Sequence, residues 1–173
     1  AACGGGAPPP RDSFGSRPWW PRRGLDFREM APEDREIVWP MVQGFYHSDA
    51  VLHPVDEAVM ERTFQDAVNP EEPLLRGVLI CADGEPAGYL YLALGYSAEV
   101  GGRCIFLEEI FFRSELRGRG LGKAALKWLR EQYPDARRLR LEVNRENAGA
   151  ARLYEKTGYQ KLDYDQMVLD LLP

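Results

Sequence analysis

Long apolar runs and an excess of basic charge are both missing from this sequence of 173 residues. No apolar run is long enough for a signal peptide or a membrane-spanning helix, so the composition argues against a membrane role. The formal net charge is −5, and electrostatics therefore give no reason to expect binding to nucleic acid or to an anionic membrane. The composition is that of an ordinary globular domain.

Cysteine is also scarce. The chain has three cysteines, an odd number at wide spacings, which fit neither a disulfide framework nor a zinc site. They are Cys3, Cys81 and Cys104. We therefore expect a cytoplasmic protein in a reducing compartment. We expect no metal site either, because His47, Asp49 and His53 are followed by no matching ligand spacing.

Residues 1–24 differ in composition from the remainder of the chain. Alanine, glycine, proline and arginine dominate there, and such a segment cannot bury enough apolar surface to offset its loss of conformational entropy. We predict a disordered leader over residues 1–24 and one domain over residues 25–173.

The spacing of apolar residues predicts the order of the secondary structure. It predicts strands over residues 25–30, 74–81, 86–94, 103–112, 137–144 and 159–169. It predicts helices over residues 33–48, 56–68, 120–132 and 147–157. The strands first follow one another, with a hairpin turn at Asp83–Gly84, and then alternate with helices. This order predicts an α/β (α+β) domain whose central mixed, mostly antiparallel sheet of about six to seven strands carries helices on both faces.

A basic, glycine-rich stretch stands between a predicted strand and a predicted helix. Its residues are Arg117, Gly118, Arg119, Gly120, Leu121, Gly122 and Lys123. Unpaired amides of a first helical turn, the helix dipole and missing Cβ atoms together favour a bound phosphate. A P-loop is excluded because position 117 is arginine and Ala124 replaces its serine or threonine. A dinucleotide fingerprint is excluded because Lys123 replaces its third glycine.

The pattern that remains, Arg-x-x-Gly-x-Gly, resembles the pyrophosphate loop of the GNAT superfamily of acetyl-CoA-dependent N-acetyltransferases. A second stretch, residues 147–159, resembles the other motif of that superfamily: an asparagine, a helix of small residues, a late tyrosine, then glycine and an aromatic residue. The two motifs occur in the right order and together cover Cys104 to about Leu169. The chain is identified on these motifs as a member of the superfamily, which implies the GNAT fold.

The resemblance implies acetyl-CoA as the co-substrate, and it implies a cofactor site. The 117–123 loop would bind the pyrophosphate, and the backbone of Ile110, Phe111 and Phe112 would pair with the pantetheine arm. Asn147 would help to orient that arm, with Ala151 and Tyr154 completing the site.

Two adjacent acids interrupt the apolar strand over residues 103–112. A primary amine must lose a proton before it attacks a thioester, and a carboxylate can accept that proton. Glu108 and Glu109 are the candidates, although without a bulge only one of them can face the cleft. The strand resembles that of small-polyamine acetyltransferases, in which the first acid faces the acceptor, so Glu108 is the preferred base. The alternative for either acid is a structural role, as a buried carboxylate paired with arginine or backbone.

Tyr154 is the general acid that the resemblance implies for the departing CoA thiolate, with packing of its helix onto the sheet as the alternative role. We therefore predict direct transfer of an acetyl group, in a ternary complex, to a primary amine of a small cationic acceptor. Protein N-terminal or lysine acetylation, or a non-catalytic acyl-CoA-binding module, are the alternatives. The resemblance also allows a homodimer. The identity of the acceptor amine does not follow from the sequence.

Overall fold

The computed structural model describes residues 24–171, and the predicted leader therefore lies almost entirely outside the described residues. Within them, strands and helices follow the predicted order. The strands are β1 (Leu25–Glu29), β2 (Leu75–Ala82), β3 (Glu85–Ser97), β4 (Gly102–Phe112) and β5 (Arg138–Leu141). The helices are α1 (Arg35–Tyr46), α2 (Glu57–Ala67), α3 (Leu121–Gln132) and α4 (Ala148–Lys156), with short 3-10 turns η1 (Pro32–Asp34) and η2 (Ser114–Leu116).

The five described strands form one sheet in the order β1-β2-β3-β4-β5. The first four pair antiparallel, and β5 alone pairs parallel, with β4. Asp83 and Gly84 have φ angles of 52° and 83°, which are the left-handed values that a tight hairpin between β2 and β3 requires. The mixed, mostly antiparallel sheet is therefore confirmed, with fewer strands than predicted.

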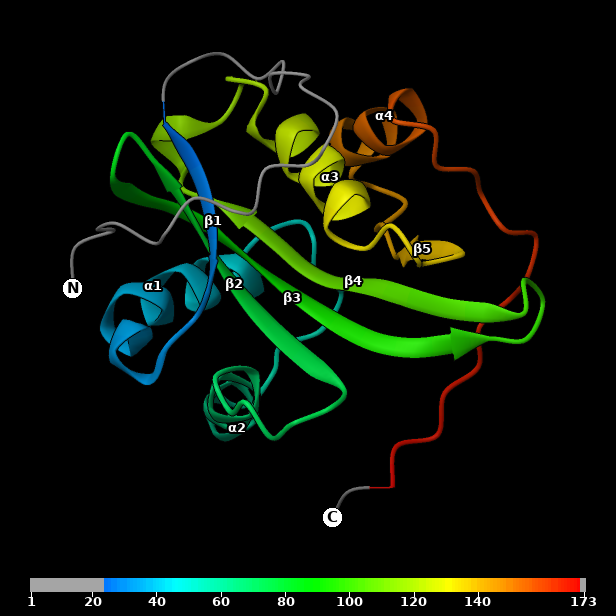
Figure 1. The fold of residues 1–173 in the computed structure, drawn as a ribbon, viewed down its shortest axis with the longest axis horizontal. Coiled ribbons are helices and arrows are strands. Elements are labelled where there is room, and N and C mark those ends of the chain that lie inside the picture. The colour runs from blue at the N-terminus through cyan, green and yellow to red at the C-terminus, as the bar shows by residue number, and fades with distance from the viewer. Residues whose placement is uncertain (1–23, 172–173) are drawn as a thin grey trace.

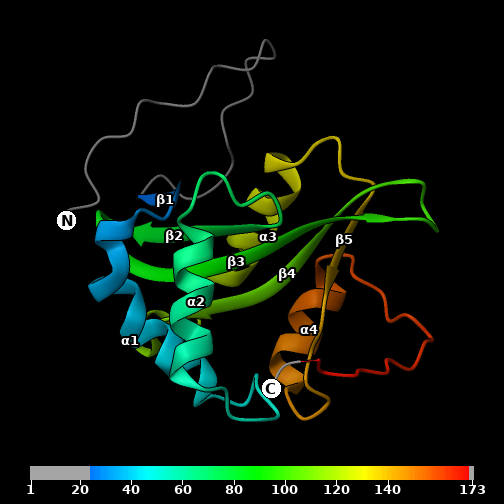
Figure 2. The ribbon, with the colours of Figure 1, turned by 90° about the horizontal axis from the view of Figure 1, so that it is seen from below.

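Helices cover both faces of the sheet, as predicted. Figure 1 shows α1 and α2 on one side and α3 and α4 on the other, and Figure 2 shows α2 crossing in front of the sheet. Val38, Met41 and Phe64 pack from the first pair of helices onto one face. Leu126 and Leu129 of α3 pack onto the other face. Alternation along the strands supplies the two cores, since successive side chains point to opposite faces.

The predicted strand over residues 159–169 is wrong. Residues 160–171 form neither helix nor strand, and every one of them is exposed (Figure 1). A strand needs a partner, and β5 offers an edge of only four residues. The Tyr164 hydroxyl interacts with Glu99, at the tip of the β3–β4 hairpin.

One cysteine departs from expectation. Cys81 is disulfide-bonded, whereas Cys104 is a free thiol buried in the sheet. The expectation of no disulfide is therefore wrong at Cys81. Among the described residues, no helix is both long and apolar enough to cross a membrane.

Candidate functional site

Strand β4 continues well beyond the end of its neighbour β5. The parallel pairing covers only Cys104 to Leu107 on β4, where Leu107 meets Leu141. On its other side β4 stays paired with β3 up to Phe112. Within the described chain, residues 108–112 therefore have a strand partner on one side only. An exposed strand edge of this kind can hydrogen-bond an extended ligand as if it were a further strand.

A β-bulge lies at the point where β5 ends. Tyr91 of β3 is opposite Glu109, and the next residue, Leu92, is opposite Leu107, so Glu108 is the extra residue. In a regular strand only one of the two acids could face the cleft. The bulge removes that restriction. Burial raises the pKa of the Tyr46 phenol on α1, and the negative charges of Glu109 and then of Glu108 raise it further, so both carboxylates lie near this tyrosine.

Glu109 is buried, with an exposed fraction of 6%. Its Oε1 accepts a hydrogen bond from the Tyr46 hydroxyl, and its Oε2 accepts one of 2.6 Å from the Tyr89 hydroxyl. Burial raises the pKa of Glu109, and the two tyrosine hydrogen bonds offset part of that rise. The partners expected for a buried acid in a structural role were arginine or backbone. Glu109 instead has two tyrosine hydroxyls as partners.

A third tyrosine faces the same carboxylate without bonding to it. Tyr91 lies opposite Glu109 in the sheet, and its buried hydroxyl has no hydrogen-bond partner among the described residues. Burial, followed by the negative charge of Glu109, raises the pKa of Tyr91. The Tyr89 and Tyr91 rings meet edge to face, with centroids 5.1 Å apart. One buried acid is therefore surrounded by three phenols.

Glu108 has the opposite environment, since its side chain is exposed. Partial desolvation raises its pKa, and the negative charge of Glu142, just after β5, raises it further. Its carboxylate is therefore reachable from solvent and more basic than an ordinary glutamate, which suits a group that accepts a proton.

The start of α3 has the geometry of an anion site. Gly118 and Gly120 have φ angles of 78° and 77°, and a Cβ atom added to either would meet nothing within 4 Å. The first helical hydrogen bond runs from the Ala124 N–H to the Gly120 carbonyl, at 3.1 Å. The amides of Leu121 and Gly122 therefore have no acceptor within the helix, and no atom occupies the Cβ positions of the two preceding glycines.

The side chains of this loop point in different directions. Arg119 and Lys123 are exposed. Arg117 turns back onto β4, where its Nε donates a 3.2 Å hydrogen bond to the Phe112 carbonyl. Its guanidinium carbon lies 5.4 Å from the centre of the Phe111 ring. Gly122 has a packing role as well, because a Cβ there would lie 2.8 Å from Leu153 of α4.

A cavity of about 590 Å³ lies between the end of α1, the far end of β4 and the start of α4. The predicted residues that line it are Ile110, Phe111, Phe112, Arg117 and Asn147. The structure does not place Gly118, Arg119, Gly120, Leu121, Gly122, Lys123, Ala151, Tyr154, Glu108 or Glu109 in its lining. The end of α1 and the connection after it supply the remaining lining residues, Gly44, Phe45, His47, Ser48, Asp49 and Ala50.

Gly44 is a sequence signal for this wall, as a glycine within a predicted helix. A Cβ at Gly44 would lie 2.8 Å from the tip of the Phe111 ring, so the glycine lets α1 approach β4 closely. Tyr46, which holds Glu109, stands between Phe45 and His47 of the cavity wall. The buried acid is therefore attached to the back of that wall.

Two asparagines organise the opposite rim. Asn147 caps α4 as predicted, since its Oδ1 accepts a 3.1 Å hydrogen bond from the Ala150 N–H. The Asn144 side chain donates a 2.9 Å hydrogen bond to the Asp49 carbonyl. That bond joins the segment after β5 to the connection between α1 and α2, from across the sheet.

Tyr154 lies on α4, one turn beyond Ala151, and its ring is buried against the sheet. Burial raises the pKa of its phenol. The Tyr159 ring lies 6.0 Å away, centre to centre. Among the described residues, no group of three or more histidine, cysteine, aspartate or glutamate side chains could hold a metal ion.

Comparison with known proteins places this geometry in a family. Residues 35–159 match the family model described as the Acetyltransferase (GNAT) family. No curated protein matches the chain. A possible acetyltransferase from Clostridium difficile 630 has a TM-score of 0.73 at 14% identity, covering 87% of this chain and 99% of that one.

Two further solved structures share the fold. The aminoglycoside N-acetyltransferase AAC(6')-Iy in complex with CoA has a TM-score of 0.68 at 15% identity, over 87% of this chain and 97% of that one. The ribosomal-protein-alanine N-acetyltransferase from Brucella melitensis biovar Abortus 2308 has a TM-score of 0.68 at 19% identity, over 86% and 99%. With a family match over residues 35–159 and this shared fold, the chain belongs to the GNAT family of acetyltransferases.

Proposed function

We propose that this protein is an N-acetyltransferase that transfers the acetyl group of acetyl-CoA to a primary amine of a small cationic acceptor, directly and in a ternary complex. The observation that carries the proposal is the continuation of β4 past β5. Among residues 24–171 it leaves residues 108–112 without a strand partner on one side, with two acids at the start of this edge and a glycine loop suited to an anion beyond its end.

The residues present fit the proposed co-substrate. The amides at the start of α3, with the open space above Gly118 and Gly120, suit a pyrophosphate, and Arg119 and Lys123 add positive charge. The free edge over residues 110–112 suits the amides of an extended arm, and Asn147 lines the same cavity. Acetyl-CoA would supply the activated acetyl thioester.

Removal of a proton from the acceptor is the step that the acids explain. A primary amine has a pKa of about 10, so at neutral pH its protonated form outnumbers the neutral form by about a thousand to one. Loss of the proton therefore adds about 4 kcal/mol to the barrier. Glu108 is the proposed proton acceptor, because its carboxylate is exposed and its pKa is raised. Glu109, held by Tyr46 and Tyr89, places a carboxyl group behind the cavity wall, and its negative charge when ionised favours a cationic acceptor.

Tyr154 is the proposed donor of a proton to the departing thiolate. Burial raises the pKa of its phenol, so the group is fully protonated at neutral pH and available as an acid. Its place on α4, the helix that Asn147 caps at the cavity rim, supports this role.

Binding of CoA tests the site before any acceptor is known. In isothermal titration calorimetry we expect Gly120→Val to abolish CoA binding, because its side chain would fill the space at the start of α3. Gly84→Val is the matched control, since Gly84 also has a left-handed φ, of 83°, and open space above it, but lies in the β2–β3 turn. Equal affinity of the two variants for CoA would refute the anion site.

Turnover tests the chemistry. Purified protein, acetyl-CoA and a thiol indicator are combined with a panel of polyamines, aminoglycosides, amino acids and peptides. We expect small cationic amines to react, with kcat/KM lowered about 10²- to 10⁴-fold in Glu108→Gln and CoA affinity unchanged. Tyr154→Phe should lower kcat. Preference for peptides would favour protein acetylation, and CoA binding without any turnover would favour a non-catalytic module.

A further inference from the structure

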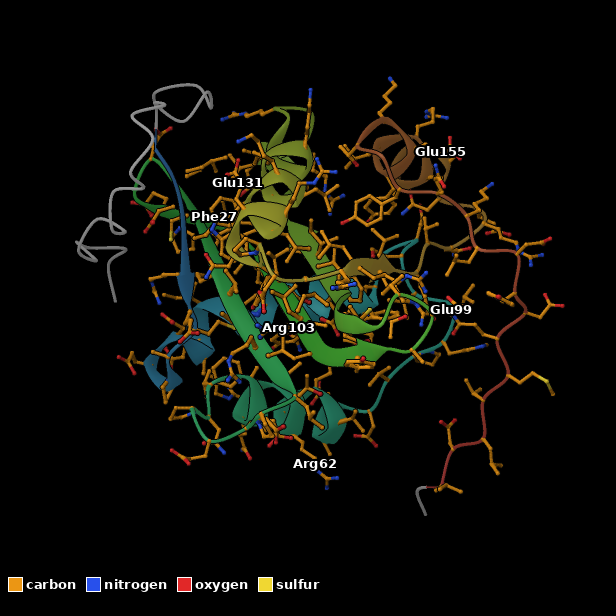
Figure 3. All side chains as sticks on the ribbon, turned by 45° about the vertical axis from the view of Figure 1, so that its right-hand side comes forward. Phe27, Arg62, Glu99, Arg103, Glu131 and Glu155 are labelled. Carbon is orange, nitrogen blue, oxygen red and sulfur yellow. The ribbon has the colours of Figure 1, made fainter. Side chains whose placement is uncertain are left out.

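A second cavity, of about 310 Å³, lies between the β3–β4 hairpin, β5 and the segment after α4. Arg138 and Arg140 of β5 line it, and Glu99 is the acid of its described lining. Figure 3 shows Glu99 on the side of the molecule along which the segment after α4 runs. Two arginines against one glutamate give the lining an excess of positive charge, which favours an anion.

The two arginines of this cavity differ in their partners. Arg138 donates a 3.3 Å hydrogen bond to the Ser97 hydroxyl and bonds to the Glu99 carboxylate. Arg140 is partly buried, and its guanidinium carbon lies 5.4 Å from the centre of the Phe106 ring. The Arg140 side chain donates no hydrogen bond to any residue that the structure describes. Its planar fork of N–H donors is therefore available for a carboxylate, which it can bind through both oxygens.

Alternation along β5 places Arg140 on the same face of the sheet as Glu108. The arginines of β5 alternate with Leu139 and Leu141, which pack in the core that α3 and α4 cover. Because successive side chains point to opposite faces, the arginines point to the side of α1 and α2. Glu108 lies near Tyr46 of α1 and therefore on that side as well.

The register between β4 and β5 fixes the spacing of the opposite charges. Arg140 lies opposite Phe106, which is two residues before Glu108 on β4. At a rise of about 3.3 Å per residue, the two positions are roughly 7 Å apart along the strand. Glu142, just after β5, adds a second acid near Glu108. This face of the sheet thus has acids at one end and an arginine at the other.

Glu108 also lies between the two cavities. Residues 110–112 of β4 line the cavity at the end of α1, and Cys104 lines the cavity that holds Arg140. A small molecule whose amine is at Glu108 can therefore extend along β4 toward Arg140, away from the free edge that the proposed co-substrate would occupy.

We propose that the acceptor carries a carboxylate as well as its amine, and that Arg140 binds this carboxylate while the amine lies at Glu108. The inference rests on the proposed function and names its substrate class, the basic amino acids. Their two ammonium groups outweigh the carboxylate, so the acceptor is still a small cation. In lysine the side-chain amine and the carboxylate are separated by a distance of the same order as the spacing along β4. Arg140 is thus a specificity-determining residue.

Steady-state kinetics with acetyl-CoA test the proposal by comparing lysine with cadaverine, which has the same aminoalkyl chain but no carboxylate. In the wild-type protein we expect kcat/KM for lysine to exceed that for cadaverine at least about tenfold. Arg140→Gln should lower kcat/KM for lysine at least about tenfold, through KM, and leave cadaverine within about twofold. Unchanged turnover of cadaverine also shows that the variant folds. Arg62→Gln is the matched control, because Arg62 is an exposed arginine of α2 (Figure 3), and it should change neither acceptor more than about twofold.

Calorimetric titration of lysine and cadaverine, in the presence of CoA, separates this inference from the proposed function. Lysine that binds through Arg140 but is not acetylated would support the carboxylate site and count against the proposed reaction. Acetylation of cadaverine without a preference for lysine would keep the proposed reaction and overturn the carboxylate site. An equal loss for both acceptors in Arg140→Gln would overturn it too, and so would a wild-type protein that neither binds nor acetylates lysine.

Discussion

The Tyr89 hydroxyl donates a 2.6 Å hydrogen bond to Oε2 of Glu109, although the residues are 20 positions apart on neighbouring strands. Tyr46 donates to the other carboxylate oxygen from α1, so strand, helix and acid are joined at one point. A buried carboxylate without donors would be costly, since desolvation of a charge in the interior is unfavourable unless hydrogen bonds replace water.

Removal of this hydrogen bond should destabilise the fold. Tyr89→Phe leaves Oε2 of Glu109 with one donor fewer, and we expect the free energy of unfolding to fall by about 1–3 kcal/mol. Tyr91→Phe is the control, because the Tyr91 hydroxyl has no partner among the described residues and its loss should be neutral or stabilising. Urea denaturation of both variants measures the difference. Equal losses would mean that the hydrogen bond contributes nothing particular.

The pH dependence of catalysis should depend on Glu142. Partial desolvation and the charge of Glu142 raise the pKa of Glu108, so Glu142→Gln should lower that pKa. If Glu108 must be ionised to accept a proton, the acidic limb of the profile of kcat/KM against pH moves to lower pH. The shift should shrink in high salt, because Glu142 is exposed. Glu155→Gln, on α4 in Figure 3, should leave the limb in place, and an equal shift there would point to a general field effect.

Asp34 should contribute stability that acid removes. Burial alone would raise its pKa, but the Arg28 guanidinium, at 2.7 and 2.8 Å, and the Ala31 N–H outweigh it, so the pKa is lowered. Its contribution is therefore present above the unfolded value of 3.8 and lost as pH falls. Asp34→Asn should cost about 2–3 kcal/mol at neutral pH, with the difference from wild type shrinking below about pH 4.

The matched control for that experiment is Glu61→Gln. Glu61 pairs with Arg35, but both side chains are partly exposed, at 30% and 43%. A pair of that kind is worth about 0.2–1 kcal/mol. Thermal or urea unfolding at several pH values compares the two variants, and a pH-independent loss for Asp34→Asn would contradict the assignment.

Gly88 should tolerate no side chain. A Cβ at this position would lie 2.2 Å from the Phe111 carbonyl oxygen, which is backbone of the neighbouring strand and cannot move away. We expect Gly88→Ala to cost about 3 kcal/mol or more and to disturb the free edge of β4. Gly95→Ala, on the same strand, would bring its Cβ no closer than 4.0 Å to the Cys104 carbonyl and should cost less than about 1 kcal/mol. Similar unfolding midpoints for the two variants would be the contrary result.

Local chemistry explains what could be predicted from the sequence. The turn at Asp83–Gly84, the cap at Asn147 and the strand–loop–helix order around Gly120 each depend on a few adjacent residues. The family follows from the same kind of information, since its two motifs are short and contiguous.

Long-range pairing explains what could not. The bulge at Glu108 is a property of the register between β3 and β4. The alternation of apolar and polar residues along one strand does not indicate it. The tyrosine shell of Glu109 depends on Tyr46, which is 63 positions away. Residues 159–169 have the composition of a strand, but their sequence does not determine whether a sheet edge is available to pair with them.

The early end of β5 has a wider consequence. The groups that it leaves open along residues 108–112 of β4 belong to the main chain, and every amino acid except proline carries both of them. Mutational drift at Ile110 or Phe112 can therefore reshape the walls while the hydrogen-bonding pattern persists. Hydrogen-bonding groups of the main chain are therefore retained as long as the sheet topology is retained, whichever side chains evolution places along the strand.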